Sequence, residues 1–326
     1  MASCASSPQT PLRGLLLQLR TPFWPDGRPW AAGGAPAVPL EDREPYLEAL
    51  GREALSRADE RMGRPVEAAW VGGGAAVGLA DERLARLLAE LRDAYGLADN
   101  GAGPAEVNLE AYPGMLDGRG LDGLRACGAT RLVVDYGTGS AAEARELGRV
   151  VASEGLAELD GALRGCGLSV EVRLLVGGPG QSAEAAVESL QKALGFGAAA
   201  VNLETFRLDP GSPLARERLR HDTAWRTDAL HAVPSAAMRV ETQGRLADVL
   251  RAEGFVEQLP GYWALPGRKG RYRLMRAAGC DVLGCGLGAR TRIDGAVACN
   301  TGDLEVYLAS ADDPERRVAS RWSEAG

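Results

Sequence analysis

The sequence predicts an α/β fold, a partial (β/α)6 TIM-like barrel with a C-terminal extension. Short β-like runs alternate with amphipathic helical runs, which is typical of parallel βα units. About six units can be counted, fewer than the eight of a closed (β/α) barrel, so we expect an open one. A chain of 326 residues with 45% apolar composition is long enough for such a barrel and an addition to it.

The elements follow in a regular order. Strands are expected at 15–19, 67–72, 106–111, 131–137, 170–177 and 199–206, and helices between them at 45–61, 80–95, 141–164 and 182–194. The turn-forming cluster LDPGSP at 208–213 ends this alternation. Two helices, 214–231 and 244–253, and a hairpin-like stretch at 255–265 are expected after it. We therefore divide the chain into a barrel over 1–210 and an extension over 211–326, which packs on the barrel and completes its site.

Composition excludes several function classes. The formal net charge is −7 and no long basic run occurs, so nucleic acid is not an expected partner. No apolar stretch approaches the roughly 20 residues that span a bilayer, and the first residues lack the layout of a signal peptide, so we expect a cytoplasmic protein. The six cysteines have no metal-ligand spacing, and we expect no metal site.

Alternate positions of the expected strands give the first functional signal. One face of each strand is apolar and should meet the helices, because successive side chains point to opposite sides. The other face of five strands carries polar or charged residues: Gln18, Arg20, Asn108, Glu110, Asp135, Glu171, Arg173, Asn202 and Glu204. Buried charges are costly unless they are paired or solvated. We therefore expect either a polar lumen that accepts a ligand or a network of internal ion pairs.

Six short motifs carry a family resemblance. They read AWVGGGAA at 69–76, VNLEAYPG at 107–114, GATRL at 128–132, LGR at 147–149, VGGPGQS at 176–182 and LGCGLGA at 283–289. In order and spacing they resemble the GGGTP, TLEANPG, GVNRLS, LGR, YGLPGQT and LGLGAGA motifs of the oxygen-independent coproporphyrinogen III oxidases and their relatives. That family is a branch of the radical SAM superfamily. The resemblance covers about residues 15–308 and implies a partial barrel of the radical SAM type.

The cluster-binding motif of that family is missing. The family begins YxHIPFCxxxCxYC, and its three cysteines are replaced here by Trp24, Arg28 and Ala31. Iron–sulfur clusters need thiolate ligands, which these side chains do not supply. The remaining cysteines stand at other positions in the chain. We therefore expect no iron–sulfur cluster and no reductive cleavage of S-adenosylmethionine (SAM).

The SAM site that the resemblance implies is partly retained. Gly72, Gly73 and Gly74 preserve the backbone path that approaches the amino-acid end of SAM, and Glu110 and Arg149 match two polar positions of the family. Two other positions differ, because a glutamine of the family aligns with Gly137 and an aspartate with Arg173. The resemblance thus implies SAM as the cofactor without implying the family's usual pose.

Arginine and tryptophan occupy several of the altered positions. Arg20 replaces the histidine of the family motif, and Arg28 and Arg173 replace a cysteine and an aspartate. Arginine binds carboxylate or phosphate with two parallel hydrogen bonds, and Trp24 and Trp30 offer flat surfaces for stacking. We expect a pocket for a small molecule with an anionic group. The alternative is that Arg20 and Arg173 pair with the carboxylates of the strands.

The leading functional hypothesis is an enzyme that runs polar chemistry in this barrel. SAM is an electrophile without a cluster, so methyl or alkyl transfer or ring closure needs a positioned nucleophile and a base. The candidate catalytic residues are Glu110, Asp135, Tyr136 and Glu204. Relatives of the family imply a specialised, natural-product biosynthetic pathway.

Three alternatives remain open. One branch of the family resembles haem chaperones, so the chain is alternatively a non-enzymatic tetrapyrrole binder whose arginines contact propionates. Another alternative is an inactive protein that stabilises an active partner. The last is an enzyme that acts on a phosphate or an amino acid without SAM.

Overall fold

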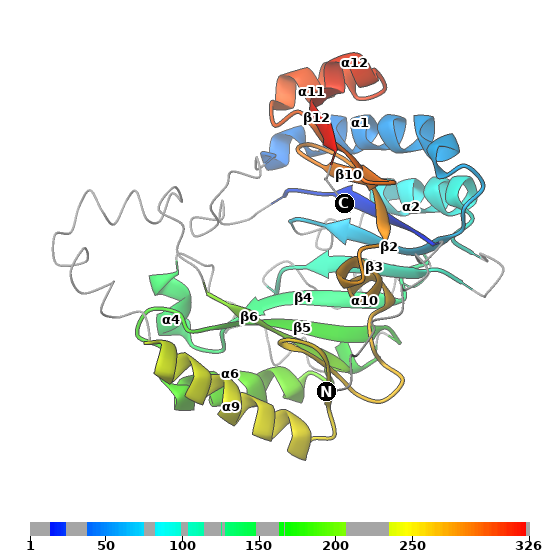
Figure 1. Ribbon diagram of the computed structural model, residues 1–326. Helices are drawn as coiled ribbons and strands as arrows, with labels where there is room; N and C mark the ends of the chain where they lie inside the picture. Colours follow the sequence, from blue (N-terminus) through cyan, green and yellow to red (C-terminus); the bar gives the residue numbers. More distant parts are fainter. Residues whose placement is uncertain are drawn as a thin grey trace, which may run out of the picture.

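The protein is described by a computed structural model over residues 14–23, 38–74, 82–98, 104–113, 125, 128–147, 163–165, 167–206 and 235–323. Its strands form one 12-stranded sheet in the order β12-β11-β10-β9-β1-β2-β3-β4-β5-β6-β8-β7. Figure 1 shows the strands side by side, with most of the described helices on one face of the sheet. The expected partial barrel with an extension is confirmed.

Six parallel strands form the barrel. They are β1 (Leu15–Arg20), β2 (Val66–Gly72), β3 (Glu106–Ala111), β4 (Arg131–Gly137), β5 (Ser169–Val176) and β6 (Ala200–Thr205). Each pairs in parallel with the next. Parallel pairing brings the carboxyl ends of all six strands to one edge, where ligands bind in open α/β sheets. The predicted strand limits differ from the observed ones by at most one residue.

Helices cover the outer face. They include α1 (Arg43–Ser56), flanked by the 3-10 turns η1 (Leu40–Asp42) and η2 (Ala58–Arg61), as well as α2 (Glu82–Tyr95), α4 (Ala141–Glu146), α6 (Ala183–Gly195) and α9 (Ala236–Ala252). Ser140 and Ser182 begin α4 and α6 by accepting a backbone hydrogen bond. The expected helix at 141–164 is only partly described, and the one at 214–231 lies outside the described residues. Among the described helices, none is long and apolar enough to cross a membrane.

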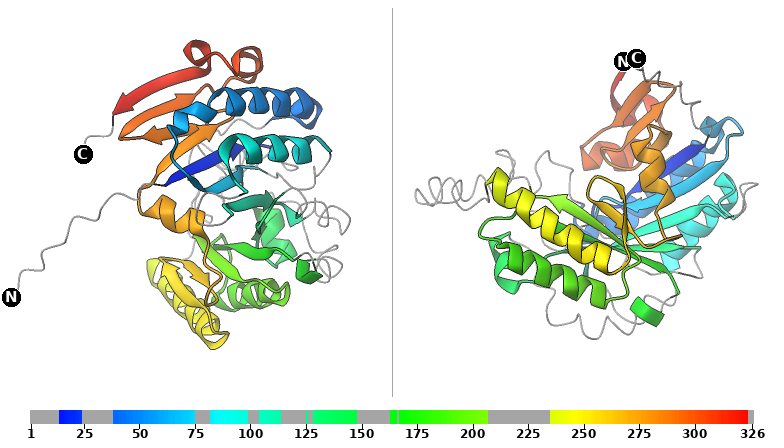
Figure 2. Two further views of the ribbon diagram at one scale, coloured as in Figure 1. Left: turned by 90° about the vertical axis from the view of Figure 1, so that its right-hand side faces the viewer. Right: turned by 60° about the horizontal axis from the view of Figure 1, so that its bottom comes forward.

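The C-terminal part adds strands to both edges of the barrel sheet. β7 (Val256–Leu259) and β8 (Tyr262–Ala264) form the expected hairpin, and β8 pairs antiparallel with β6. β9 (Asp281–Cys285) pairs in parallel with β1, and β10 (Arg290–Ile293), β11 (Ala296–Asn300) and β12 (Val318–Ser323) continue from it. Figure 2 shows these strands at the end of the sheet near α1. Hydrogen bonds within one sheet thus join the predicted barrel, 1–210, to the predicted extension, 211–326. The boundary near residue 210 lies outside the described residues.

Helix α10 (Arg271–Ala277) lies on the inner face of the sheet. It contacts β1, β2 and β3. Its Tyr272 ring packs on Trp70 of β2 with 5.3 Å between ring centroids, in a small buried cluster that includes Leu16 and Val133. This helix was not predicted. It fills part of the barrel interior with apolar contacts and leaves the carboxyl ends of the strands to polar residues.

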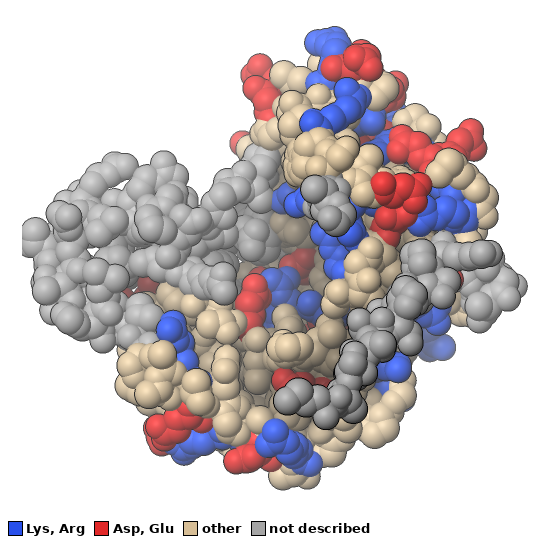
Figure 3. Space-filling model, in the orientation of Figure 1, with Lys and Arg blue, Asp and Glu red and all other residues tan. Residues whose placement is uncertain are grey.

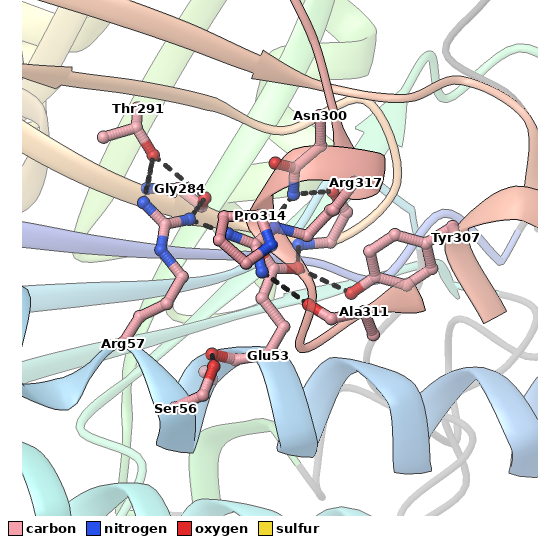
Figure 4. A network of polar contacts seen from close by, with 12 residues as sticks. Glu53, Ser56, Arg57, Gly284, Thr291, Asn300, Tyr307, Ala311, Pro314 and Arg317 are labelled. Carbon is pink, nitrogen blue, oxygen red and sulfur yellow. Dashed lines mark hydrogen bonds and ion pairs between the residues drawn. The ribbon is translucent and has the colours of Figure 1, made fainter. Parts of the chain in front are cut away.

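A buried carboxylate joins α1 to the C-terminal strands. Glu53 of α1 is fully buried between α1 and the short helices α11 (Leu304–Ser310) and α12 (Pro314–Arg317), as Figure 4 shows. Its Oε1 accepts hydrogen bonds from Arg57 and Asn300 and forms an ion pair with Arg317. Its Oε2 accepts from the Gly286 amide and from the Tyr307 hydroxyl. A carboxylate with this many donors is well compensated for its burial. Glu53 therefore fixes the turn after β9 against α1.

Candidate functional site

The inner face of the barrel is polar in two layers. In the lower layer, near the amino ends of the strands, Arg131 and Glu171 are buried and lie 3.9 Å apart (Nη1 to Oε2), and Arg273 of α10 pairs with the same Glu171. Glu106 accepts the backbone amides of Arg271 and Tyr272 at 2.8 and 3.0 Å, which anchors the start of α10. This layer is an internal ion network, one of the two outcomes that strand alternation predicted.

The upper layer centres on Glu110 at the end of β3. This side chain is 4% exposed. Its Oε2 accepts from the Gly73 amide at 2.7 Å and from Trp70 Nε1 at 3.3 Å, and its Oε1 pairs with Arg173 of β5. Both carboxylate oxygens are therefore engaged, which fits a residue that positions neighbours better than one that accepts a proton from a substrate.

Arg173 is the cation of this layer. It also contacts Glu204 of β6, with 3.3 Å between Nη2 and Oε2. Burial alone would lower its pKa, but the carboxylates of Glu110, Asp135 and Glu204 outweigh that effect and raise the pKa of Arg173. The arginine that replaces the family's aspartate is thus paired within the protein, the alternative that the sequence analysis kept open for Arg173.

Close packing and backbone conformation explain why positions 72–74 are all glycine. A Cβ on Gly72 would lie 2.2 Å from Glu110 Oε2, and a Cβ on Gly74 would lie 2.3 Å from the Thr21 carbonyl oxygen. Gly73 has φ +92°, which favours glycine. The turn therefore needs glycine to bring Glu110 and the end of β1 against the backbone of β2, whether or not a ligand is bound.

Arg20, at the end of β1, faces this turn. Its Nη1 donates to the Gly288 carbonyl at 2.9 Å, while its Nε is buried without a hydrogen-bond partner among the described residues. Burial lowers the pKa of Arg20, and Tyr46 and Glu110 oppose that effect. Tyr46 supports the same strand end, because its hydroxyl donates to the Arg20 carbonyl at 2.8 Å and accepts the Leu287 amide. Arg20 is thus oriented and keeps donor capacity.

The remaining predicted catalytic residues divide between the two faces. Asp135 is 5% exposed and acts on Arg173 electrostatically, and Glu204 has a side chain that is 48% exposed. Tyr136 lies on the opposite, helix-covered face, edge-on to Phe196 at 5.5 Å between centroids. Its placement in the site was wrong, because strand alternation puts it with Leu132 and Val134. Burial raises the pKa of Tyr136 to about 12, as expected for a core phenol.

The described part of the upper layer holds two arginines, Arg20 and Arg173, and three carboxylates. Its formal charge over these residues is therefore −1. Figure 3 shows cationic and anionic side chains inside a hollow at the centre of the face that Figure 1 presents. Four predicted site residues, Trp24, Arg28, Trp30 and Arg149, lie outside the described residues, so their roles stay predictions.

Residues of the interior that the sequence analysis missed are aromatic or belong to α10. Trp70 was placed in an expected strand at 67–72 and given no role in the site, although its alternation with Ala69 and Val71 predicts the inner face. Arg273 lies over the Trp70 ring, with 5.1 Å from its guanidinium carbon to the ring centroid. The sequence could have indicated Trp70 as an interior residue, because it is a large aromatic side chain among small residues. No sequence pattern indicated that α10 lies inside the barrel.

Comparisons with known proteins agree with this geometry. The chain matches no family model. It is 26% identical over 268 residues to anaerobilin synthase of Escherichia coli O157:H7, covering 80% of this chain and 57% of that protein. It is 32% identical over 254 residues to the heme chaperone HemW of Mycobacterium tuberculosis, covering 75% of this chain and 60% of that one. The chain thus spans less than two thirds of the length of these curated relatives.

A solved structure supports the same assignment at the level of the fold. Coproporphyrinogen III oxidase (HemN) from Escherichia coli, described as a radical SAM enzyme, superposes with a TM-score of 0.77 at 20% identity, covering 98% of this chain and 74% of that one. The six sequence motifs and the open barrel of six parallel strands are in keeping with this match and with the two curated relatives. The chain therefore belongs to the HemN-like branch of the radical SAM superfamily.

Proposed function

We propose that this chain binds SAM at the carboxyl ends of β1–β6 without an iron–sulfur cluster, and that it catalyses a polar alkyl transfer or cyclisation in a specialised biosynthetic pathway. The observation that carries the proposal is the formal charge of −1 over the described residues of the upper layer. SAM has a sulfonium, an ammonium and a carboxylate, so it is a zwitterion with an excess of positive charge. A site with an arginine donor beside an excess of carboxylates is complementary to that pattern.

The residues present do not fit a cluster. The positions of the family's three cysteines hold Trp24, Arg28 and Ala31. In the part of the chain that the structure describes, no three His, Cys, Asp or Glu side chains are grouped to hold a metal ion. Cys285 is fully buried in β9, and burial raises its pKa, which disfavours the thiolate that iron requires. The proposed chemistry therefore uses no step that passes through a cluster.

The described residues do fit SAM. The Nε of Arg20 would donate to its carboxylate, and Asp135 and Glu204 would stabilise its cationic groups. When bound, SAM supplies an electrophilic carbon on its sulfonium. Among the described residues Glu204 is the best-placed general base, because its side chain is half exposed and its contact with them is an ion pair between its Oε2 and Arg173.

Calorimetric titration with SAM and with S-adenosylhomocysteine tests the proposal. The two ligands share the adenosine and amino-acid parts and differ in the sulfonium charge, so we expect SAM to bind about tenfold more tightly, a difference of about 1.4 kcal/mol. Arg20→Gln should weaken both ligands, whereas Arg52→Gln, which alters an exposed arginine on α1, should weaken neither. No SAM binding at millimolar concentration, or a stoichiometric cluster in protein prepared without oxygen, would refute the proposal.

Haem binding is the second candidate, and the observation that favours it is the 32% identity to a protein named as a heme chaperone. The formal charge of −1 over the described residues of the upper layer opposes it, because haem carries two propionates. Titration with haem would give a saturable Soret shift if this second function held. We expect only weak, non-saturating association under the conditions in which SAM binds.

A further inference from the structure

A cavity of about 350 Å³ lies on the inner face of the barrel, between α10 and the turn that joins β7 to β8. Its walls include Trp70, Tyr262 and Tyr272. These three rings come from β2, β8 and α10, so the C-terminal part of the chain completes an enclosure that the barrel strands only begin. Aromatic walls of this kind favour a flat ligand.

The floor of the cavity is rigid. The Arg273 guanidinium lies 5.1 Å from the Trp70 ring centroid and 5.4 Å from that of Tyr262, and it pairs with the fully buried Glu171. Because Arg273 is held by two rings and a carboxylate, it orients the aromatic walls and has little capacity left for a ligand. The cavity is thus preorganised.

Three polar side chains of the same cavity are not engaged. The carboxamides of Gln18 and Asn202 and the exposed guanidinium of Arg276 line it, and none of them has a side-chain hydrogen bond or ion pair within the described residues. The Tyr272 hydroxyl is buried without a hydrogen-bond partner there as well. One cation with two carboxamides is a donor set suited to a single carboxylate.

The cavity adjoins the site proposed for SAM. Trp70 links the two, because its ring forms a wall while its Nε1 donates to Glu110 of the upper layer at 3.3 Å. Gln18 and Asn202 lie two residues before Arg20 and Glu204 on the same strands and on the same face. A ligand in the cavity would therefore extend toward the carboxyl ends of β1 and β6.

We propose that this cavity binds a planar aromatic carboxylic acid of one or two rings, the acceptor substrate of the alkyl transfer; this inference rests on the proposed function. Its carboxylate contacts Arg276 and the carboxamides. Its ring packs against the lining of the cavity and does not stack on Trp70 or Tyr262, because Arg273 already lies over both of those rings. A volume of about 350 Å³ is at the lower end of the range for small-molecule sites, which favours one or two rings over a tetrapyrrole.

Saturation-transfer NMR and calorimetry with indole-3-acetate test this inference, with 3-methylindole as the ligand that keeps the ring and lacks the carboxylate. We expect indole-3-acetate to bind and Arg276→Gln to weaken it about tenfold, which is the effect of one charge-assisted hydrogen bond. Binding of 3-methylindole should be weaker in the unaltered protein and unchanged by that variant. Arg268→Gln, which removes an exposed arginine from a different cavity, is the matched control and should have no effect.

Two results would overturn the inference: no binding of indole-3-acetate at millimolar concentration, or binding that Arg276→Gln leaves unchanged. Asn202→Leu provides a second variant at the opposite wall and should also weaken the acid selectively. The titrations are run with and without SAM, so this inference and the proposed function can fail separately. Binding of the acid without any binding of SAM would retain the cavity assignment and refute the cofactor.

Discussion

The Glu53 network allows a quantitative test of how the C-terminal strands are held. Replacing Glu53 by glutamine keeps the shape of the side chain and removes its charge and one acceptor. The NH2 group of the new glutamine would best face the Gly286 amide and Tyr307, because the tyrosine hydroxyl can turn to accept a hydrogen bond. The glutamine oxygen would then stay with the donors Arg57 and Asn300 and beside the Arg317 guanidinium. The Gly286 amide then loses its partner.

The expected cost follows from these losses. An orphaned buried donor costs about 1–3 kcal/mol, and removing one partner of a buried ion pair costs about 3–5 kcal/mol. Arg57 keeps Glu60 as a second carboxylate, which reduces the loss for that arginine. Arg317 is 2% exposed and, among the described residues, Glu53 is its ion-pair partner. We expect Glu53→Gln to lower the free energy of unfolding by about 3–5 kcal/mol.

Urea denaturation followed by circular dichroism measures this difference, and Glu60→Gln is the matched control. Glu60 also pairs with Arg57, but its side chain is 43% exposed, so its replacement should cost at most about 1 kcal/mol. Glu53→Gln should also weaken any ligand that contacts Arg20, because Gly286 and Gly288 belong to the same turn. If the two variants differ by less than about 1 kcal/mol, the assigned role of Glu53 is wrong.

Two further predictions concern the barrel itself. Gly74→Ala should destabilise the protein by about 3 kcal/mol in the same assay, because its Cβ would overlap backbone atoms of Thr21 and Phe23 that cannot move independently; a cost below about 1 kcal/mol would contradict the packing described for this turn. Tyr136→Phe should change stability at pH 7 by less than about 1 kcal/mol, because the buried hydroxyl has no hydrogen-bond partner in the described structure. The pKa of Tyr136 is about 12 in the folded state and about 10 in the unfolded state, so the stability that is present below pH 10 is lost as the pH rises toward 12. Between pH 7 and pH 11 the unaltered protein should therefore lose about 1.4 kcal/mol more of its free energy of unfolding than Tyr136→Phe. Equal losses in the two proteins would refute the assignment.

The alternation of strands and helices was sufficient to predict the barrel, and the alternation of side chains along each strand was sufficient to predict which residues face its interior. Alternation along β3 and β5 put Glu110 and Arg173 inside, and the structure places them in contact. The same rule assigns Tyr136 to the helix side, so its inclusion in the site was avoidable. Whether Arg173 would bind a ligand or pair internally depended on the distance between two strands, which no local pattern contains.

The C-terminal part was harder to predict because its contacts are long-range. The run around Leu283 was recognised as part of a family motif, and no strand was expected there. Residues 281–285 form a strand whose partner is β1, far away in the sequence. The seven residues of α10 follow a basic stretch, which favours a surface loop in a sequence-based interpretation. Contact with the inner face depends on Glu106 anchoring the start of the helix, a contact between residues far apart in sequence.

The pairing of β9 with β1 has a consequence for how the protein is made. β1 is synthesised about 260 residues before β9, so within the described sheet one edge of β1 has no partner until residues 281–285 have been made. Until then the nascent chain exposes an apolar edge strand, a template for pairing with other chains. Premature termination before β9 should therefore yield aggregating fragments, and chaperone protection during translation would be most valuable over this interval.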